Sequence, residues 1–241
     1  MRAGDAGRRQ NTARGVAVLI VMLVMTVASS LALALVLLTT LETHAAFNFR
    51  GGSEALFAAD AGIELALLDL AAAANWSSVL DGSSVSTFVD GAAGVRILPD
   101  GRPLNLVEVV NLATCGHAAA CSPAEMDAVT ESRPWGANNP RWHLYMHGPT
   151  GSLAPGQVLR SSCYLLVLVA DDPSETDGDP LRDGLAGQSP GADTLLVRSE
   201  AFGPAGAHKI IEATVAKPDG PGPQPTGVRL VAWREVREPR F

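Results

Sequence analysis

The sequence lacks the short motifs by which many enzymes are recognised. It contains no serine-nucleophile motif, no phosphate-binding glycine loop and no HExxH metal-binding motif. Each of these motifs places a reactive group at a fixed spacing, so a catalytic role has almost no support from the sequence. We therefore predict that the protein is not an enzyme.

Positive charge is scarce beyond the first fifteen residues. The chain of 241 residues has a net charge of −7, whereas residues 1–15 hold four Arg and one Asp, which gives +3 there and about −10 in the remainder. An acidic surface repels nucleic acid and acidic lipid head groups. Neither is expected to bind the body of the protein.

Formal charge is absent altogether from Val16 to Leu41. These 26 residues would form a helix of about 39 Å, longer than the roughly 30 Å hydrocarbon core of a bilayer. We predict a transmembrane helix over 16–41. A cleaved secretory signal is the weaker alternative, because its apolar region spans only about 7–15 residues. Hydropathy alone leaves a plain single-pass anchor open.

Three arginines, Arg8, Arg9 and Arg14, precede the apolar segment, and the acidic body follows it. The positive-inside rule then predicts a cytoplasmic N-terminus and a body outside the cytoplasmic membrane. That compartment is oxidising, so cysteines there form disulfides.

The chain has three cysteines. Cys115 and Cys121 close a short loop and are the favoured disulfide, which leaves Cys163 as a small apolar residue in a buried strand. Pairing of either one with Cys163 stays open. A zinc site is a weaker alternative because no repeat of paired ligands supports it; its residues would be Cys115, Cys121, Cys163, His117, His143 and His147.

Gly15 ends the short basic leader and is followed at once by the apolar residues 16–20, as in a type IV prepilin signal. Three further blocks continue the pattern: Leu41-Glu42-Thr43, Asn48-Phe49-Arg50 and the segment Ala55–Glu64. With these blocks the chain resembles the PilX family of type IV pilus assembly proteins, which are minor pilins. Near the C-terminus, Leu195–Val215 and Trp233-Arg234-Glu235 also resemble the family, and the middle of the chain does not.

The resemblance implies a processed, filament-forming subunit. Residues 1–15 would be a leader that prepilin peptidase removes between Gly15 and Val16, and the new N-terminus at Val16 would be methylated. The protein would reside in the inner membrane, with its head in the periplasm, and then enter a pilus. Its partners would be other minor and major pilins, bound through the N-terminal helix.

Two residues depart from the pattern of major pilins, which have Phe and Glu as the first and fifth mature residues. This chain has Val16 and Ile20 there, and a missing Glu is typical of PilX-like and GspK-like subunits. In the pilin arrangement that Glu compensates the buried N-terminal ammonium of a neighbour. A subunit without it is expected at or near the filament tip.

Residues 42–74 are predicted to continue the helix in amphipathic form. Apolar residues recur at three- and four-residue spacing, which places them on one face that can dock on a sheet; they are Leu56, Ala59, Ile63, Ala66, Leu67 and Leu70. Gly51 and Gly52 interrupt the helix, so we expect a kink or local melting there, or a loop between two helices.

Residues 75–241 are predicted to form an exported head with an antiparallel sheet, and the whole chain an α+β, pilin-like fold. Strands are expected near 93–98, 157–170, 194–200, 209–215 and 228–236. Residues 104–112 fit a strand or a helix, residues 122–126 a short capped helix, and residues 131–157 an irregular loop.

Residues 171–183 follow the most apolar strand and hold six acids and one Arg. Oxygen ligands on a flexible loop with glycine suit calcium, so we predict a possible Ca²⁺ site, although the spacing does not match an EF-hand. The alternative is a solvated acidic loop. The candidate ligands are Asp171, Asp172, Asp177, Asp179 and Asp183.

The sequence thus predicts a minor pilin that helps assemble or prime a type IV pilus. Two alternatives stay open. One is a GspK-like minor pseudopilin of type II secretion, and the other is an uncleaved single-pass membrane protein with an exported ligand-binding head.

Overall fold

The computed structural model describes residues 6–153, 161–184, 189–218 and 227–237, and for residues 6–14 the backbone alone. It divides into two compact units, Met1–Phe49 and Arg50–Phe241. The helices are α1 (Ala6–Ala72), α2 (Ser77–Leu80), α3 (Leu106–Cys115) and α4 (Pro123–Met126), with short 3₁₀ turns at Gly136–Asn138, Thr150–Ser152 and Pro204–Gly206. The strands are β1 (Val95–Ile97), β2 (Pro103–Asn105), β3 (His143–Pro149), β4 (Tyr164–Asp171), β5 (Thr194–Phe202), β6 (His208–Ala216) and β7 (Arg229–Val236).

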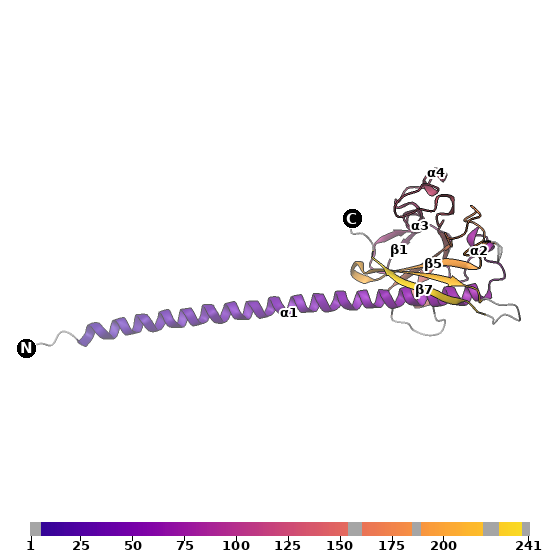
Figure 1. Ribbon diagram of the computed structural model, residues 1–241. Helices are drawn as coiled ribbons and strands as arrows, with labels where there is room; N and C mark the ends of the chain where they lie inside the picture. The colour runs from indigo at the N-terminus through magenta and orange to yellow at the C-terminus, as the bar shows by residue number, and fades with distance from the viewer. Residues whose placement is uncertain (1–5, 154–160, 185–188, 219–226, 238–241) are drawn as a thin grey trace, which may run out of the picture. The chain divides into compact units, whose positions relative to one another are not determined.

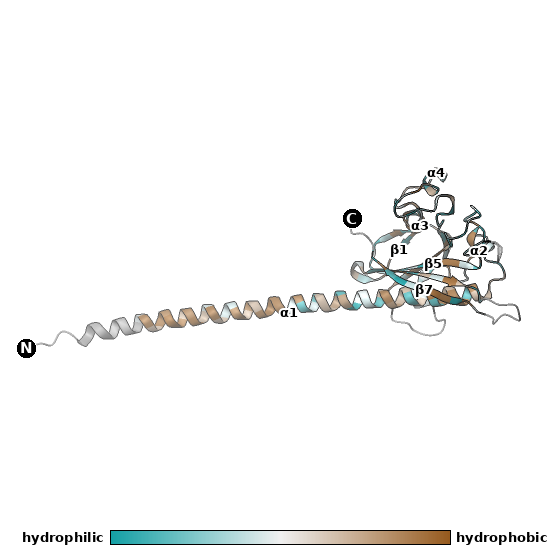
Figure 2. Cartoon of the chain, in the orientation of Figure 1, coloured by the Kyte–Doolittle hydropathy of each residue, from teal (hydrophilic) through white to brown (hydrophobic). Residues whose placement is uncertain are grey.

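The first unit is the N-terminal part of α1. Every described side chain from Val16 to Leu41 is exposed, and this apolar stretch is coloured brown in Figure 2. The few hydroxyls bond back to the helix, as when Thr26 donates to the carbonyl of Leu23 at 2.8 Å and Thr40 to that of Val36 at 2.8 Å. Such bonds make hydroxyls tolerable in a membrane. Among the described helices, α1 alone is long and apolar enough to cross a membrane, a criterion that a signal sequence near an N-terminus also satisfies.

The helix α1 continues through Gly51 and Gly52 without a break. The predicted local melting, and the alternative of a loop between two helices, are therefore wrong. The reason is that Gly51 is buried and lies near Pro204 and Ala207, so tertiary packing offsets the intrinsic cost of glycine. The helix ends at Ala72, two residues before the end of the predicted range 42–74.

The second unit is an antiparallel five-stranded sheet in the order β3-β4-β5-β6-β7, with a separate β1–β2 hairpin. Residues 50–72 of α1 lie on one face of the sheet, and α3 lies on the other (Figure 1). The predicted α+β class, with a long apolar N-terminal helix and an antiparallel sheet, is confirmed.

Alternating residues of β4 divide its contacts between two cores. Leu165, Val167 and Val169 pack with the α1 residues, which include Ala59, Ile63 and Leu70. Tyr164, Leu166, Leu168 and Ala170 pack with α3 and Trp142 on the opposite face. All eight residues of β4 are buried, as the almost wholly apolar segment predicts for a central strand.

The strands expected near 93–98, 194–200, 209–215 and 228–236 are confirmed. The strand expected over 157–170 begins only at Tyr164, since residues 161–163 are not in a strand and residues 157–160 lie outside the described residues. One strand is not predicted by the sequence. β3 lies inside residues 131–157, which we expected to be irregular. Its polar residues His143 and His147 obscure the strand pattern in the sequence, and it forms because β4 pairs with it. Residues 104–112, which fitted either class, divide between the end of β2 and α3.

The close approach of α1 to the sheet depends on Gly62. A Cβ added there would lie 2.3 Å from Ser199 Oγ and 2.8 Å from Leu165 Cδ1. We predict that Gly62→Ala lowers the free energy of unfolding by about 1–3 kcal/mol through overpacking.

Gly52→Ala is the matched control, because a Cβ on Gly52 meets nothing within 4 Å. It should raise stability by about 0.5–1 kcal/mol through helix propensity. Denaturant unfolding of the full chain in detergent micelles measures both variants, and equal effects of the two would contradict the close contact at Gly62.

Candidate functional site

The acidic segment after β4 is the densest group of titratable residues in the second unit. Three of its predicted calcium ligands instead accept backbone N–H groups two residues ahead. Asp172 accepts from Ser174 at 2.9 Å, Asp177 from Asp179 at 3.0 Å, and Asp179 from Leu181 at 3.3 Å. These local bonds are typical of Asx turns.

In the described part of the chain, no three His, Cys, Asp or Glu side chains form a group that can hold a metal ion. The five aspartates predicted as ligands are therefore not brought together as a set in these residues. The calcium site stays a prediction.

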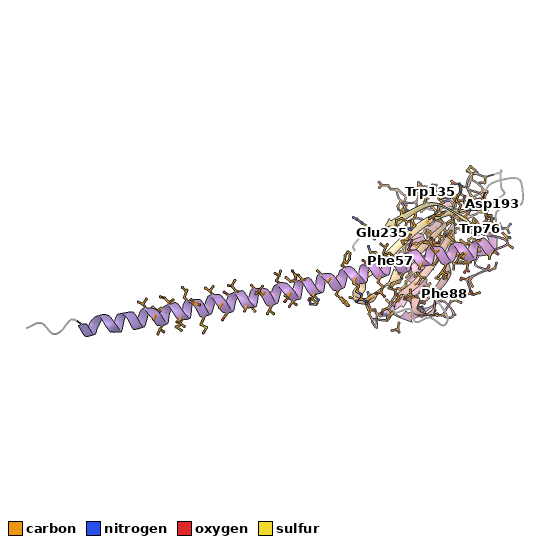
Figure 3. All side chains as sticks on the ribbon, turned by 90° about the horizontal axis from the view of Figure 1, so that it is seen from below. Phe57, Trp76, Phe88, Trp135, Asp193 and Glu235 are labelled. Carbon is orange, nitrogen blue, oxygen red and sulfur yellow. A yellow bond between two sulfur atoms is a disulfide. The ribbon has the colours of Figure 1, made fainter. Side chains whose placement is uncertain are left out.

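Asp183 ties the acidic segment to the end of β6. Its Oδ1 accepts the Asp193 N–H at 2.7 Å, and Lys217 Nζ lies 3.1 Å from its Oδ2 and 2.6 Å from Asp193 Oδ1. The same ammonium lies 4.4 Å from the centroid of the Trp76 ring, and Figure 3 shows Trp76 and Asp193 at one end of the second unit. Burial disfavours the charge on Lys217, but the carboxylates of Asp193 and Asp183 outweigh it and raise the lysine pKa.

Two further carboxyl groups, those of Asp171 and Glu175, are buried with little compensation. Asp171 is 3% exposed and its Oδ1 has no hydrogen-bond partner among the described residues. Glu175 is 1% exposed and accepts the Gly184 N–H at 3.0 Å. A Cβ on Gly184 would lie 2.5 Å from Glu175 Oε2, so glycine is needed for this contact.

Burial is the main reason why both carboxyl groups hold a proton near neutral pH. It raises the pKa of Asp171 to about 8, with a further increase from the charge of Glu175. It raises the pKa of Glu175 to about 7, with smaller increases from Asp177 and Asp183. Groups with strongly shifted pKa values often mark functional sites. None of the described hydrogen bonds joins Asp171 or Glu175 to a nucleophilic side chain.

A second polar cluster surrounds Asp90. Its Oδ1 accepts from Arg96 Nε at 2.8 Å and lies 2.8 Å from His147 Nδ1, while its Oδ2 accepts from the Tyr164 hydroxyl at 3.0 Å. Burial opposes the charge on Asp90, but hydrogen bonds from Arg96, Tyr164 and His147 outweigh it and lower the pKa. Burial lowers the pKa of His147. Among described side chains His147 bonds only to Asp90 and Tyr164, so this cluster fastens the segment around Asp90 to β3.

No described hydrogen bond joins the cysteines, His117 or His143 to this cluster. Cys115 and Cys121 form a disulfide, and Cys163 is a buried free thiol whose pKa is raised by burial. His117 Nε2 lies 3.3 Å from Glu125 Oε1, and His143 is a partly buried residue of β3. The described residues therefore contain no zinc-binding group.

The predicted processing site lies in the first unit. Val16 and Ile20 are each 55% exposed, and a Cβ on Gly15 would meet nothing within 4 Å. The backbone around Gly15 is helical and is not covered by other described residues.

No protein-family profile, curated protein or solved structure matches the chain.

Sequence patterns did not single out Glu175 or the residues around Asp90. Glu175 is one of six acids in a polar loop, and only its burial distinguishes it. Asp90 meets residues 57 and 74 positions away along the chain, so no local pattern signals the contact.

The buried carboxyl groups predict a stability that falls as pH rises. The folded chain holds protons on Asp171 and Glu175 that the unfolded chain releases near the ordinary carboxyl pKa. The stability that these two groups contribute is therefore fully present below about pH 4 and is lost as pH rises through about 7 to 8. We predict that Asp171→Asn removes on the order of 2 kcal/mol from the stability difference between about pH 5 and pH 8.

Asp100→Asn is the control. Although burial opposes it, hydrogen bonds from Arg102 lower the Asp100 pKa, so this group is ionised at both pH values. Thermal unfolding at the two pH values measures the effect, and an equally steep pH dependence in Asp171→Asn and the parent would count against the assignment.

Proposed function

We propose that this protein is a minor pilin of the PilX kind, which helps assemble or prime a type IV pilus at or near its tip. The observation that carries the proposal is that unpartnered apolar side chains continue along α1 beyond the predicted membrane segment. Phe47 and Phe49 are 55% and 78% exposed, and Phe57 and Leu68 are 73% and 69% exposed. A plain membrane anchor does not need exposed apolar residues beyond the membrane segment, whereas a subunit whose helix packs against neighbouring helices does.

Phe57 and Leu68 lie on the side of α1 that faces away from the sheet. They are eleven residues apart, about three helical turns, and alternate with buried residues such as Ala59, Ile63 and Ala66. The docked half of the helix therefore has one face committed to the sheet and another face still able to bind. In the proposal, other minor and major pilins occupy that second face.

The first mature residues support the same proposal. The apolar segment would be held in the inner membrane with the head outside. Prepilin peptidase would remove the leader by cutting after Gly15. Because Ile20 cannot neutralise the terminal ammonium of a neighbour, repeated incorporation is disfavoured. A place near the tip follows from this electrostatic difference.

The closest alternative is a GspK-like pseudopilin of type II secretion, which shares the helix and the cleavage. Deletion of the protein separates the two, since loss of surface pili supports the pilus role and loss of secreted protein supports the other. The uncleaved single-pass membrane protein with a ligand-binding head differs at the N-terminus.

We predict that the mature chain begins at methylated Val16. Gly15→Leu should leave the leader attached, because the peptidase of this family selects glycine before the cut, and Gly52→Ala should be processed normally. Mass spectrometry of the N-terminal peptide from the membrane fraction measures this. A mature chain that retains residues 1–15 would support the uncleaved alternative.

We also predict that Ile20→Glu raises the number of copies of this subunit per filament several-fold, because the new carboxylate compensates a neighbouring ammonium. Val21→Glu is the control, since it adds the same charge about 100° further around the helix. Quantitative mass spectrometry of sheared filaments gives the ratio to the major subunit. An unchanged ratio in Ile20→Glu would refute the electrostatic argument for a tip position.

A further inference from the structure

The two edges of the five-stranded sheet differ in whether another described segment pairs with them. The outer edge of β3 is covered by residues 86–90 of the same chain. Ser86 N–H donates to the Tyr145 carbonyl at 3.0 Å, His147 N–H to Phe88 at 3.0 Å, and Asp90 N–H to His147 at 3.1 Å. No described segment pairs with the outer edge of β7 between Leu230 and Val236.

The strand β7 has only some of the features that discourage pairing at an edge. It has no proline, glycine or lysine, and although a bulge at Val231 interrupts its register with β6, it pairs regularly from Ala232 to Val236. Leu230, Val231 and Trp233 are 42%, 52% and 46% exposed. An edge strand with a regular stretch and exposed apolar side chains can accept another strand.

A hollow of about 170 Å³ lies over β5, β6 and β7, with Trp142 in its wall. Its walls are largely apolar, and at one side Glu212 Oε2 accepts from Arg234 Nε at 3.0 Å. A cavity of about 150 Å³ accommodates a benzene-sized group, so the hollow can take one apolar side chain. The lining residues are Trp142, Leu196, Glu212, Ala213, Thr214, Ala232, Trp233 and Arg234.

We propose that the outer edge of β7 binds an extended strand of a different exported subunit by β-strand addition. Main-chain hydrogen bonds to the regular stretch Ala232–Val236 supply the pairing, and an apolar side chain of the incoming strand occupies the hollow above Ala232. Since Arg234 is already neutralised by Glu212, the side chain that enters carries no charge. The edge thus selects an uncharged, apolar-rich strand.

The geometry favours a different subunit over a second copy of this chain. Antiparallel pairing of two β7 strands in one continuous sheet needs a two-fold axis normal to the sheet, which keeps residues 50–72 on the same face but reverses their direction. The Arg50 ends of the two docked helices would then point in opposite directions. Both chains must enter one membrane through that end, a condition that rests on the proposed function.

Site-specific photo-crosslinking in the producing cells tests the proposal. The photoreactive residue p-benzoylphenylalanine replaces Trp233 in the full chain, and in a control chain it replaces Trp135. The two tryptophans are matched in exposure, at 46% and 45%, and Trp135 lies outside the sheet. Positions 231 and 235 are labelled in turn to follow the partner along the strand.

We expect position 233 to crosslink to one exported protein at least about tenfold more than position 135, because only the former lies on an open edge. Moving the label by two residues along β7 should shift the adduct by two residues in an uncharged segment of that partner. Val231→Lys should reduce the adduct at least about tenfold, since an edge lysine discourages pairing. Val129→Lys, at another exposed valine, should leave it unchanged.

Three results would overturn the proposal: equal crosslinking at 233 and 135, an adduct between two copies of this chain, or a partner contact that does not move along the strand. The N-terminal peptide of the same samples is measured in parallel. A mature Val16 without the strand adduct refutes the edge site and leaves the pilin proposal standing. An intact leader together with the strand adduct refutes the pilin proposal and leaves the edge site standing.

Discussion

The close packing of residues 50–72 of α1 on the sheet is the contact on which the rest of the second unit depends. Ala55, Ala59 and Ala66 are completely buried, and Gly62 leaves room for Ser199 and Leu165. Small residues bring the helix axis near the strands, so that Ile63 and Leu70 reach the core. Without this layer the central strand β4 would have one apolar face in water.

The helix α1 has two parts with different surroundings, an exposed apolar part and a part that is buried on one side. From Val16 to Leu41 it is apolar all round and exposed all round, which suits a membrane or a bundle of other helices. Beyond Arg50 it is buried on one side, yet Phe57 and Leu68 remain exposed on the other. The same helix can thus hold the sheet and keep a surface for partners, which is the physical basis of the assembly role proposed above.

Two buried carboxyl groups in the sheet, those of Glu200 and Asp171, have pKa values shifted in opposite directions. Arg198 lies 2.6 Å from Glu200 and 2.8 Å from Glu212, and His208 lies 2.9 Å from Glu200. Burial opposes the charge on Glu200, but His208 and Arg198 outweigh it and lower its pKa. No described salt bridge joins Asp171 to a cation, so burial prevails and its pKa rises to about 8. Pairing, and not burial alone, decides whether these carboxyl groups are charged.

Several features of the molecule follow from local sequence. The apolar segment 16–41, the stripe of residues 59, 63, 66 and 70, the strands β4 to β7 and the capped helix α4 with Ser122 at its start were all predictable. Each depends on the hydropathy or hydrogen-bonding groups of residues a few positions apart. The hypothesis of a processed pilin also comes from local sequence, through Gly15 and Ile20.

Contacts between distant residues decided the remainder. β3 is a strand because β4 pairs with it, despite its histidines, and the helix passes through Gly51 because the chain near Pro204 and Ala207 packs there. The proton held by Asp171 and the unequal edges of the sheet likewise depend on which segments lie alongside. Periodicity tells which side chains share a face, but pairing partners and burial are set by the whole fold, because desolvation and strand hydrogen bonds act between residues far apart in the chain.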